Sequence, residues 1–284
     1  MKGLRSIAVT GAAGRIGRAI CNEARRNDIH VVGIDAIPCD GIVKADVRDT
    51  NQLSRLFEGA ECVFHCAGLH APHVGLQSED TFKSINIDGT ASVLRAAETA
   101  GTDRFVLTST TAVYGGGAAN DEPARWIDET CPSLPRTIYH STKLEAEALV
   151  IAATGQHLTA SIVRLGRCFP EPARLMAIYR LSRGINERDS GRAHLHAAMA
   201  TGVDPMPMIA TARTPFQRGD EPRLTHSLRA LLEERCPYFV ETFDRLGWVL
   251  PDRIDRVYDS SRAQNQWNWA PLHGFASSMK ESTT

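Results

Sequence analysis

The 284-residue sequence lacks a long apolar run, a strong excess of charge, and any repeat or low-complexity tract. No stretch approaches the roughly 20 apolar residues that a helix needs to span a bilayer. Lys2 and Arg5 lead straight into a short apolar run, which does not resemble a signal peptide. The formal net charge of −1 excludes a global field that would recruit nucleic acid or an anionic membrane. We therefore expect no nucleic-acid and no membrane partner.

Cysteine occurs seven times, an odd number at irregular spacing. This pattern does not fit a disulfide framework and favours the reducing cytoplasm, where we expect the protein to reside. The run CVFHC at 62–66 holds two cysteines and a histidine, but its apolar residues predict a buried strand. The pairs His70/His73 and His194/His196 are expected in a loop or on a helix face, so no metal is predicted.

The sequence does contain enough apolar material for a large core, with 43% hydrophobic and 23% charged residues. Over the first two thirds, short β-branched runs alternate with longer helical patterns. This alternation predicts an α/β fold with a doubly wound parallel sheet (Rossmann type). The predicted strands are 6–11, 30–35, 41–47, 61–68, 104–109 and 159–165, and the predicted helices are 15–27, 51–60, 79–100 and 137–150.

Gly11, Gly14 and Gly17 lie between the first predicted strand and its helix. The first glycine allows a tight turn, the second lets backbone N–H groups approach a pyrophosphate, and the third lets the helix pack against its strand. Asp35 ends the second strand, where a carboxylate accepts hydrogen bonds from adenosine ribose hydroxyls and repels a 2′-phosphate. The pattern predicts NAD, rather than NADP, as the cofactor.

The alternation of strands and helices weakens beyond about residue 170, where prolines become frequent. We therefore predict two domains. Residues 1–170 would form the dinucleotide-binding Rossmann domain. Residues 171–284 would form mainly a smaller C-terminal substrate-binding lobe, with parts that return to the sheet.

Tyr139 and Lys143 lie four residues apart, on one face of the helix predicted from 137. A neighbouring ammonium favours the phenolate, so we expect the pKa of Tyr139 to fall below its usual value of about 10. The phenol could then act as base in alcohol oxidation and as acid in the reverse reaction, while Lys143 reaches ribose hydroxyls. Ser109, Thr110 and Thr111 end the fifth strand, where open sheets bind ligands, and would hold the substrate oxygen.

Together these motifs resemble the extended short-chain dehydrogenase/reductase family. After the glycines and Asp35 come HCAG (65–68), NIDGT (86–90), TSTTAVYG (108–115) and YHSTK (139–143), in family order. The resemblance places the family's catalytic Ser/Thr at Thr110 and makes Asn86 a residue that positions the active site. It implies tightly bound NAD, hydride transfer at C4 of the nicotinamide, and frequently a homodimer through two long helices. The predicted cofactor contacts are Gly11, Gly14, Arg15, Ile16, Gly17, Asp35, Asp46, Val47, Ala67, Gly68, Tyr139 and Lys143, with Asp46 at the adenine edge.

Departures from the family pattern reduce the number of candidate reactions. Thr111 and Ala112 stand where family dehydratases usually carry Asp and Glu, so we set dehydration aside. Arg167 stands where nucleotide-sugar epimerases commonly have Asn. An arginine at this position could bind a phosphate or carboxylate through two hydrogen bonds, or it could form a surface ion pair. The run CFPEP (168–172) is similar to uronate dehydrogenases, which oxidise a free sugar acid. This likeness implies that Arg174 or Arg167 binds a substrate carboxylate.

Three hypotheses about function remain open. The leading one is an NAD-dependent oxidoreductase that acts on a secondary alcohol of a carbohydrate-type substrate, with Tyr139 as general acid/base. The second is a nucleotide-sugar epimerase, which uses the same groups, returns the hydride to the other face and retains its NAD. The third is a non-catalytic NAD(H) sensor, which would need only the phosphate loop.

Overall fold

The computed structural model describes residues 3–155, 157–200 and 205–280. Its centre is a seven-stranded sheet in the order β3-β2-β1-β4-β5-β7-β8, and every pair of neighbours is parallel. The strand order reverses between β1 and β4, which is the point where doubly wound sheets bind ligands. The strands are β1 (Ser6–Thr10), β2 (His30–Asp35), β3 (Ile42–Lys44), β4 (Cys62–His65), β5 (Arg104–Thr110), β7 (Thr159–Leu165) and β8 (Met208–Ala210).

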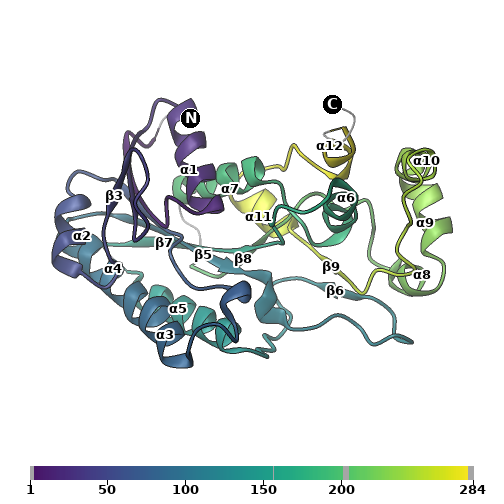
Figure 1. Cartoon of the computed structure of the whole chain (residues 1–284), viewed down its shortest axis with the longest axis horizontal. Coiled ribbons are helices and arrows are strands. Elements are labelled where there is room, and N and C mark those ends of the chain that lie inside the picture. The colour runs from purple at the N-terminus through teal and green to yellow at the C-terminus, as the bar shows by residue number, and fades with distance from the viewer. Residues whose placement is uncertain (1–2, 156, 201–204, 281–284) are drawn as a thin grey trace.

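Helices cover both faces of this sheet (Figure 1). Side chains alternate along each strand, so Ile7 and Val9 pack under one helical layer and Ala8 packs under the other. The predicted doubly wound sheet is therefore confirmed. One layer consists of α1 (Arg15–Arg26), α7 (Glu187–Met199) and α11 (Ser261–Gln266), and the other of α2 (Thr50–Leu56), α4 (Gly89–Thr99) and α5 (Ile138–Ala153).

The six predicted strands are present, and three further strands were not predicted. β8 pairs with β7 at the edge of the sheet, and a small parallel sheet joins β6 (Arg125–Ile127) to β9 (Arg256–Tyr258). The helix predicted over 79–100 is divided into α3 (Glu79–Lys83), a π-helical turn (Ser84–Asp88) and α4.

A second lobe lies beside the sheet, at the right of Figure 1, and has a hydrophobic core of its own. Phe239 and Phe243 are fully buried in it, with their rings stacked at 4.2 Å. In contrast, α7 and β8 return to the sheet, and the domain boundary at residue 170 stays a prediction. The helices of this lobe are α6 (Ala173–Ser182), α8 (Glu221–His226), α9 (Leu228–Arg235), α10 (Pro237–Arg245) and α12 (Phe275–Lys280).

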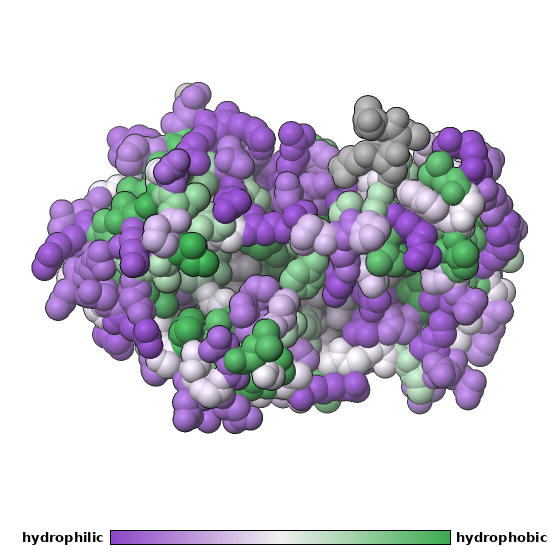
Figure 2. All heavy atoms as spheres, in the orientation of Figure 1, coloured by the Kyte–Doolittle hydropathy of each residue, from purple (hydrophilic) through white to green (hydrophobic). Residues whose placement is uncertain are grey.

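The molecular surface is largely hydrophilic on the face drawn in Figure 2. Hydrophilic residues dominate its periphery, and hydrophobic residues gather around its hollowed middle. Within residues 3–155, 157–200 and 205–280, no helix is long and apolar enough to cross a membrane.

Candidate active site

The loop between β1 and α1 has the backbone shape that a pyrophosphate site requires. Gly11 has a φ of +71°, and a Cβ there would lie 2.6 Å from the backbone nitrogen of Ala67. A Cβ on Gly17 would lie 2.1 Å from the carbonyl oxygen of Gly11, so α1 approaches its strand only without a side chain. Gly14 begins α1, and no described side chain caps this helix end. Its first N–H groups therefore face the loop and can bind an anion.

Asp35 is fixed at the end of β2, beside the glycine loop. Its carboxylate accepts hydrogen bonds from the backbone nitrogens of Ala13 (2.9 Å) and Ile37 (3.0 Å). This position suits the adenosine ribose of NAD. Asp46 is exposed, and its hydrogen bond from the Arg48 side chain holds the pKa of the carboxyl below its usual value. The predicted contact of Asp46 with adenine stays a prediction.

The remaining predicted cofactor residues lie along the same edge of the sheet. The Arg15 side chain forms an ion pair with Glu187 of α7, at 2.8 Å. Ile16 packs against the core, and Val47 packs so closely on α4 that a Cβ on Gly89 would lie 2.9 Å from its Cγ2. The side chains of Ile16 and Val47 thus contribute packing, and their contacts with the cofactor stay predictions.

Asn86 connects the loop after β4 to α5. Its Oδ1 accepts a hydrogen bond from the Leu69 nitrogen (2.7 Å), and its Nδ2 donates to the Leu69 carbonyl and the Thr142 hydroxyl (both 3.0 Å). A Cβ on Gly68 would lie 2.9 Å from Asn86 Oδ1, so glycine is needed for this approach. Asn86 lies in the π-helical turn, a feature that is frequent at functional sites. Its contacts fit a residue that positions the loop.

Two of the histidines that were considered as metal ligands are buried and have hydroxyl partners. His65 is held between the hydroxyls of Thr10 (2.7 Å) and Thr90 (3.1 Å), and burial lowers its pKa to about 3. His194 contacts the Thr108 hydroxyl at 2.9 Å and connects α7 to β5. In the part of the chain that the structure describes, no group of three His, Cys, Asp or Glu could hold a metal ion.

The structure brings Tyr139, Lys143 and Thr110 together at the carboxyl edge of the sheet. The Thr137 side chain caps α5 by accepting a hydrogen bond from the His140 nitrogen, so the helix starts just before Tyr139. The Thr110 hydroxyl, at the end of β5, accepts a hydrogen bond from the Ala112 nitrogen at 3.1 Å and is close enough to the Tyr139 phenol to lower its pKa. Lys143 follows one turn later on the same helix face and is 8% exposed.

The expected fall in the pKa of Tyr139 is wrong for the protein chain by itself. Burial raises this pKa above its usual value, and the Thr110 hydroxyl offsets the rise only in part. Burial also lowers the pKa of Lys143 to about 8, against the opposing charge of Glu147. The spacing of the two groups could be predicted from the sequence but their loss of water could not, and here desolvation is the larger effect.

Ser109 does not fit its predicted role. Because side chains alternate along β5, Ser109 points toward α5, where its hydroxyl donates to Glu147 Oε1 at 2.5 Å. Ser109 is 3% exposed and is already bonded, so it does not hold the reacting oxygen. Thr111 is also buried, and its hydroxyl donates to the Leu165 carbonyl at 3.3 Å. Thr110 is therefore the hydroxyl that accompanies Tyr139.

The sequence did not predict a row of adjacent aromatic rings and guanidinium groups that leads into the second lobe. This row, here called the ladder, consists of His70, Phe169, Arg167, Tyr179 and Arg183. The ring centroids of His70 and Phe169 lie 5.9 Å apart. The Arg167 guanidinium lies 5.0 Å from the Phe169 ring and 4.8 Å from the Tyr179 ring, and that of Arg183 lies 4.7 Å from the Tyr179 ring. No local pattern signals the ladder, because its members come from three separate segments of the chain.

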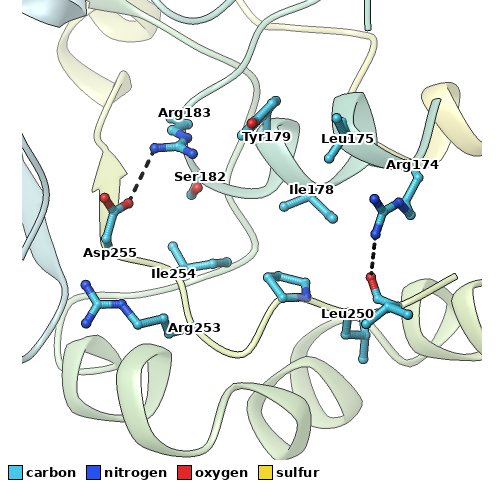
Figure 3. A pocket seen from close by; sticks show the side chains of 12 residues that line it. Arg174, Leu175, Ile178, Tyr179, Ser182, Arg183, Leu250, Arg253, Ile254 and Asp255 are labelled. Carbon is cyan, nitrogen blue, oxygen red and sulfur yellow. Dashed lines mark hydrogen bonds and ion pairs between the residues drawn. The ribbon is translucent and has the colours of Figure 1, made fainter. Parts of the chain in front are cut away.

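Through Tyr179 and Arg183 the ladder reaches a cavity of about 270 Å³ between α6 and residues 249–255 (Figure 3), and none of Thr110, Tyr139 and Lys143 is among the residues that line it. Burial is the main cause of the lowered pKa of His70, and the charges of His73 and Lys143 add to it. Arg174, Arg183 and Arg253 line the cavity together with the apolar side chains of α6 and of residues 249–254. Asp255 also lines the cavity and forms an ion pair with Arg183 at 3.5 Å, so the lining combines arginines, one of them paired, with apolar walls.

The two arginines predicted to bind a substrate carboxylate occupy different positions. Arg174 lines the cavity and donates to the Val249 carbonyl at 3.3 Å (Figure 3). Arg167 does not line this cavity, and its Nε donates to Glu171 at 3.0 Å. The ion pair that was the alternative for Arg167 is therefore present, and the binding of a substrate carboxylate by either arginine stays a prediction.

Lys143→Met is expected to stabilise the folded protein at pH 7 by about 2 kcal/mol. The pKa of Lys143 is about 8 in the folded chain, against an ordinary value of 10.5. Between these two values the unfolded state binds more protons, so the stability of the wild type rises with pH across this window. The advantage of the variant should shrink accordingly. Urea unfolding of both proteins at three pH values checks this, and a constant difference would contradict it.

Comparison with known proteins gives a family for most of the sheet domain. Residues 7–178 match the NAD dependent epimerase/dehydratase family. The L-arabinose 1-dehydrogenase (NAD(P)(+)) of Haloferax volcanii is 35% identical over 153 residues, which are 50% of this chain and 59% of that protein. Short-chain dehydrogenase/reductase family 42E member 1 of Xenopus laevis is 30% identical over 165 residues, 54% and 42% of the two chains. The chain thus spans less than two thirds of either relative.

Solved structures share the fold over nearly the whole chain. A short-chain dehydrogenase/reductase superfamily protein from Agrobacterium tumefaciens with bound NAD has a TM-score of 0.73 at 22% identity, covering 98% of this chain and 96% of that one. A mutated uronate dehydrogenase has a TM-score of 0.70 at 19% identity, covering 98% and 86%. The family match, the glycine loop and the shared fold agree. The chain belongs to the NAD dependent epimerase/dehydratase family, a group of extended short-chain dehydrogenases/reductases.

Proposed function

We propose that the protein is an NAD-dependent oxidoreductase that acts on a secondary alcohol of a sugar or sugar derivative. The observation that carries this proposal is the assembly of Tyr139, Lys143 and Thr110 at the sheet edge that also holds the glycine loop. The residues fit NAD, because the loop leaves room for a pyrophosphate and Asp35 stands where the ribose would lie. NAD, when bound, supplies the hydride acceptor.

The chain's own residues handle the substrate oxygen and its proton. Thr110 and Tyr139 would bind the alcohol oxygen, and Tyr139 would take its proton during oxidation and return it in the reverse reaction. The Lys143 ammonium would hold ribose hydroxyls and stabilise the phenolate. Because Lys143 is almost fully buried, its charge acts through a medium of low dielectric and is weakly screened by water.

The arginine-lined cavity favours a small anionic substrate such as a free sugar acid. Its volume of about 270 Å³ lies just below the usual range of small-molecule pockets, which is about 300–1,000 Å³. That size would suit a monosaccharide better than a nucleotide sugar, as a dehydrogenase of free sugar acids needs. Arg174 would bind the carboxylate as a charge-assisted hydrogen-bond donor.

Net formation of NADH distinguishes a dehydrogenase from an epimerase. The purified protein is given NAD and a panel of uronic acids and aldoses, and NADH is followed by its absorbance. We expect NADH to accumulate in step with an oxidised sugar acid. An epimerase would interconvert sugars with no net NADH, and that outcome would overturn the proposal.

Arg174→Gln provides the matching test of the substrate class. Loss of the guanidinium should raise KM for a sugar acid by about 10- to 100-fold, since a hydrogen bond to a charged group is worth about 1.5–3 kcal/mol. KM for a neutral aldose should stay the same, because that substrate offers no carboxylate. An equal effect on both substrates would contradict the role of Arg174.

Two other expectations stay predictions. A homodimer follows from the family resemblance, and a cytoplasmic location follows from the cysteine pattern. Neither affects the arrangement of the catalytic groups within one chain.

A further inference from the structure

Glu147 is buried beneath the catalytic pair, and no role was predicted for it. Tyr139, Lys143 and Glu147 follow one another at intervals of four residues on α5, so they share one helix face. Glu147 is 3% exposed and Lys143 is 8% exposed. A carboxylate removed from water in this way is costly unless it is paired and hydrogen-bonded. Its partners therefore indicate what it does.

Side chains from two neighbouring strands, β5 and β7, bind the Glu147 carboxylate. Ser109 of β5 and Arg164 of β7 are directly paired in the register of the sheet. The Ser109 hydroxyl donates to Oε1 at 2.5 Å, and Arg164 donates through Nε to Oε1 at 3.0 Å and through Nη2 to Oε2 at 2.7 Å. The Arg164 guanidinium in turn lies 4.8 Å from the ring centroid of the buried Tyr114. Both carboxylate oxygens are thus fixed in position.

Glu147 is also the charged group that opposes the burial of Lys143. Burial lowers the pKa of Lys143, and the charge of Glu147 is the largest opposing influence, ahead of Cys66. Cys66 is an uncharged thiol at pH 7, since burial raises its pKa to about 12. His65 and His70 face Lys143 from β4 and from the loop after it, and both have lowered pKa values, so they are neutral. Of the described groups that act on Lys143, Glu147 is the one carboxylate, and it lies one helical turn away on the same face of α5.

We propose that Glu147, fixed by Ser109 and Arg164, is a positioning residue that keeps the Lys143 ammonium charged and in place beside Tyr139. The proposal rests on the proposed role of Lys143 and goes beyond it, because Glu147 acts through Lys143. A purely structural Glu147 would only join α5 to β5 and β7. Its replacement would then leave the titration of Lys143 unchanged.

Glu147→Gln tests the proposal directly, because it removes the charge and keeps the shape and an acceptor for Ser109. The chain has only five lysines, so carbon-13 NMR of labelled lysine side chains resolves Lys143, which Lys143→Met identifies. We expect Lys143 to titrate about one pH unit lower in the variant than in the wild type. Glu145→Gln is the matched control, since Glu145 is exposed on the same helix, and it should leave the titration unchanged.

An unchanged titration of Lys143 in folded Glu147→Gln would overturn the proposal. Should this variant fail to fold because it leaves Arg164 buried without its partner, E147Q/R164M removes both charges together. Arg164 is not among the described charges that act on Lys143, so a lower titration is again expected, and a wild-type titration in the folded double variant would overturn the proposal. The measurement needs neither substrate nor cofactor. Its failure is therefore distinct from a failure of the proposed function, which appears as undiminished activity in Tyr139→Phe.

Discussion

Tyr139→Phe is expected to lower kcat by about 100- to 10,000-fold, the usual contribution of a positioned general acid/base. The substitution removes the hydroxyl that lies beside Thr110 and keeps the aromatic ring. NAD affinity should change by less than about three-fold, equivalent to about 0.7 kcal/mol, because the glycine loop and Asp35 are untouched. Stopped assays of NADH formation measure kcat, and calorimetric titration measures the affinity for NAD.

Tyr238→Phe is the matched control for this substitution. Tyr238 lies on α10 of the second lobe and is 47% exposed, so removing its hydroxyl should leave both kcat and NAD affinity at wild-type values. If Tyr139→Phe turned over sugar substrate as fast as the wild type, the catalytic assignment would be wrong. If the wild type bound NAD but turned over no member of a broad sugar panel, the NAD(H) sensor would be the better account.

The sheet could be predicted from the sequence because its signals are local. β1, β2, β4, β5 and β7 are apolar runs that stand between helical patterns, and each pairs with a neighbour in a parallel sheet. β8 has only three residues in a proline-rich segment, and it becomes a strand by pairing with β7. The small sheet of β6 and β9 joins segments about 130 residues apart. Such pairings depend on the fold and leave no periodic signal.

The difference between local signals and contacts that depend on the fold also explains the predictions about the site. The spacing of Tyr139 and Lys143 is a local property of one helix, and it placed them on one face. Choosing between Ser109 and Thr110 requires the direction of side chains at the end of β5, where a shift of one residue reverses the face. The family resemblance indicated Thr110, and the bond between Ser109 and Glu147 supports that choice.

Burial was the property that the sequence predicted least well. The effect of Lys143 on Tyr139 was inferred from charge alone, yet Lys143 is 8% exposed and burial is the main cause of the raised pKa of Tyr139. Glu147 continued the same four-residue spacing and could have been noticed. Its meaning depends on Arg164, which arrives from β7, so only the folded structure distinguishes it from a solvent-exposed charge.

Gly17→Ala is expected to be the most damaging single-atom addition in the cofactor loop. The new Cβ would lie 2.1 Å from the Gly11 carbonyl oxygen and 2.8 Å from the Ala12 Cα, both backbone atoms that cannot rotate away. Helix α1 must therefore shift from β1, and we expect a loss of about 3 kcal/mol in the free energy of unfolding, at the upper end for overpacking. NAD affinity should fall by at least about 30-fold, equivalent to about 2 kcal/mol, because the helix N-terminus moves with α1.

Gly155→Ala separates this clash from the general effect of adding a methyl group. No described atom lies within 4 Å of a Cβ at Gly155, which is outside the cofactor loop, so both NAD affinity and unfolding should match the wild type within about 0.5 kcal/mol. Urea unfolding and NAD titration of the two variants measure the contrast. If Gly17→Ala bound NAD as tightly as the wild type, the close approach of α1 to its strand would not form the phosphate site. The anion would then have to be held elsewhere, and the proposed placement of the nicotinamide beside Tyr139 would lose its physical basis.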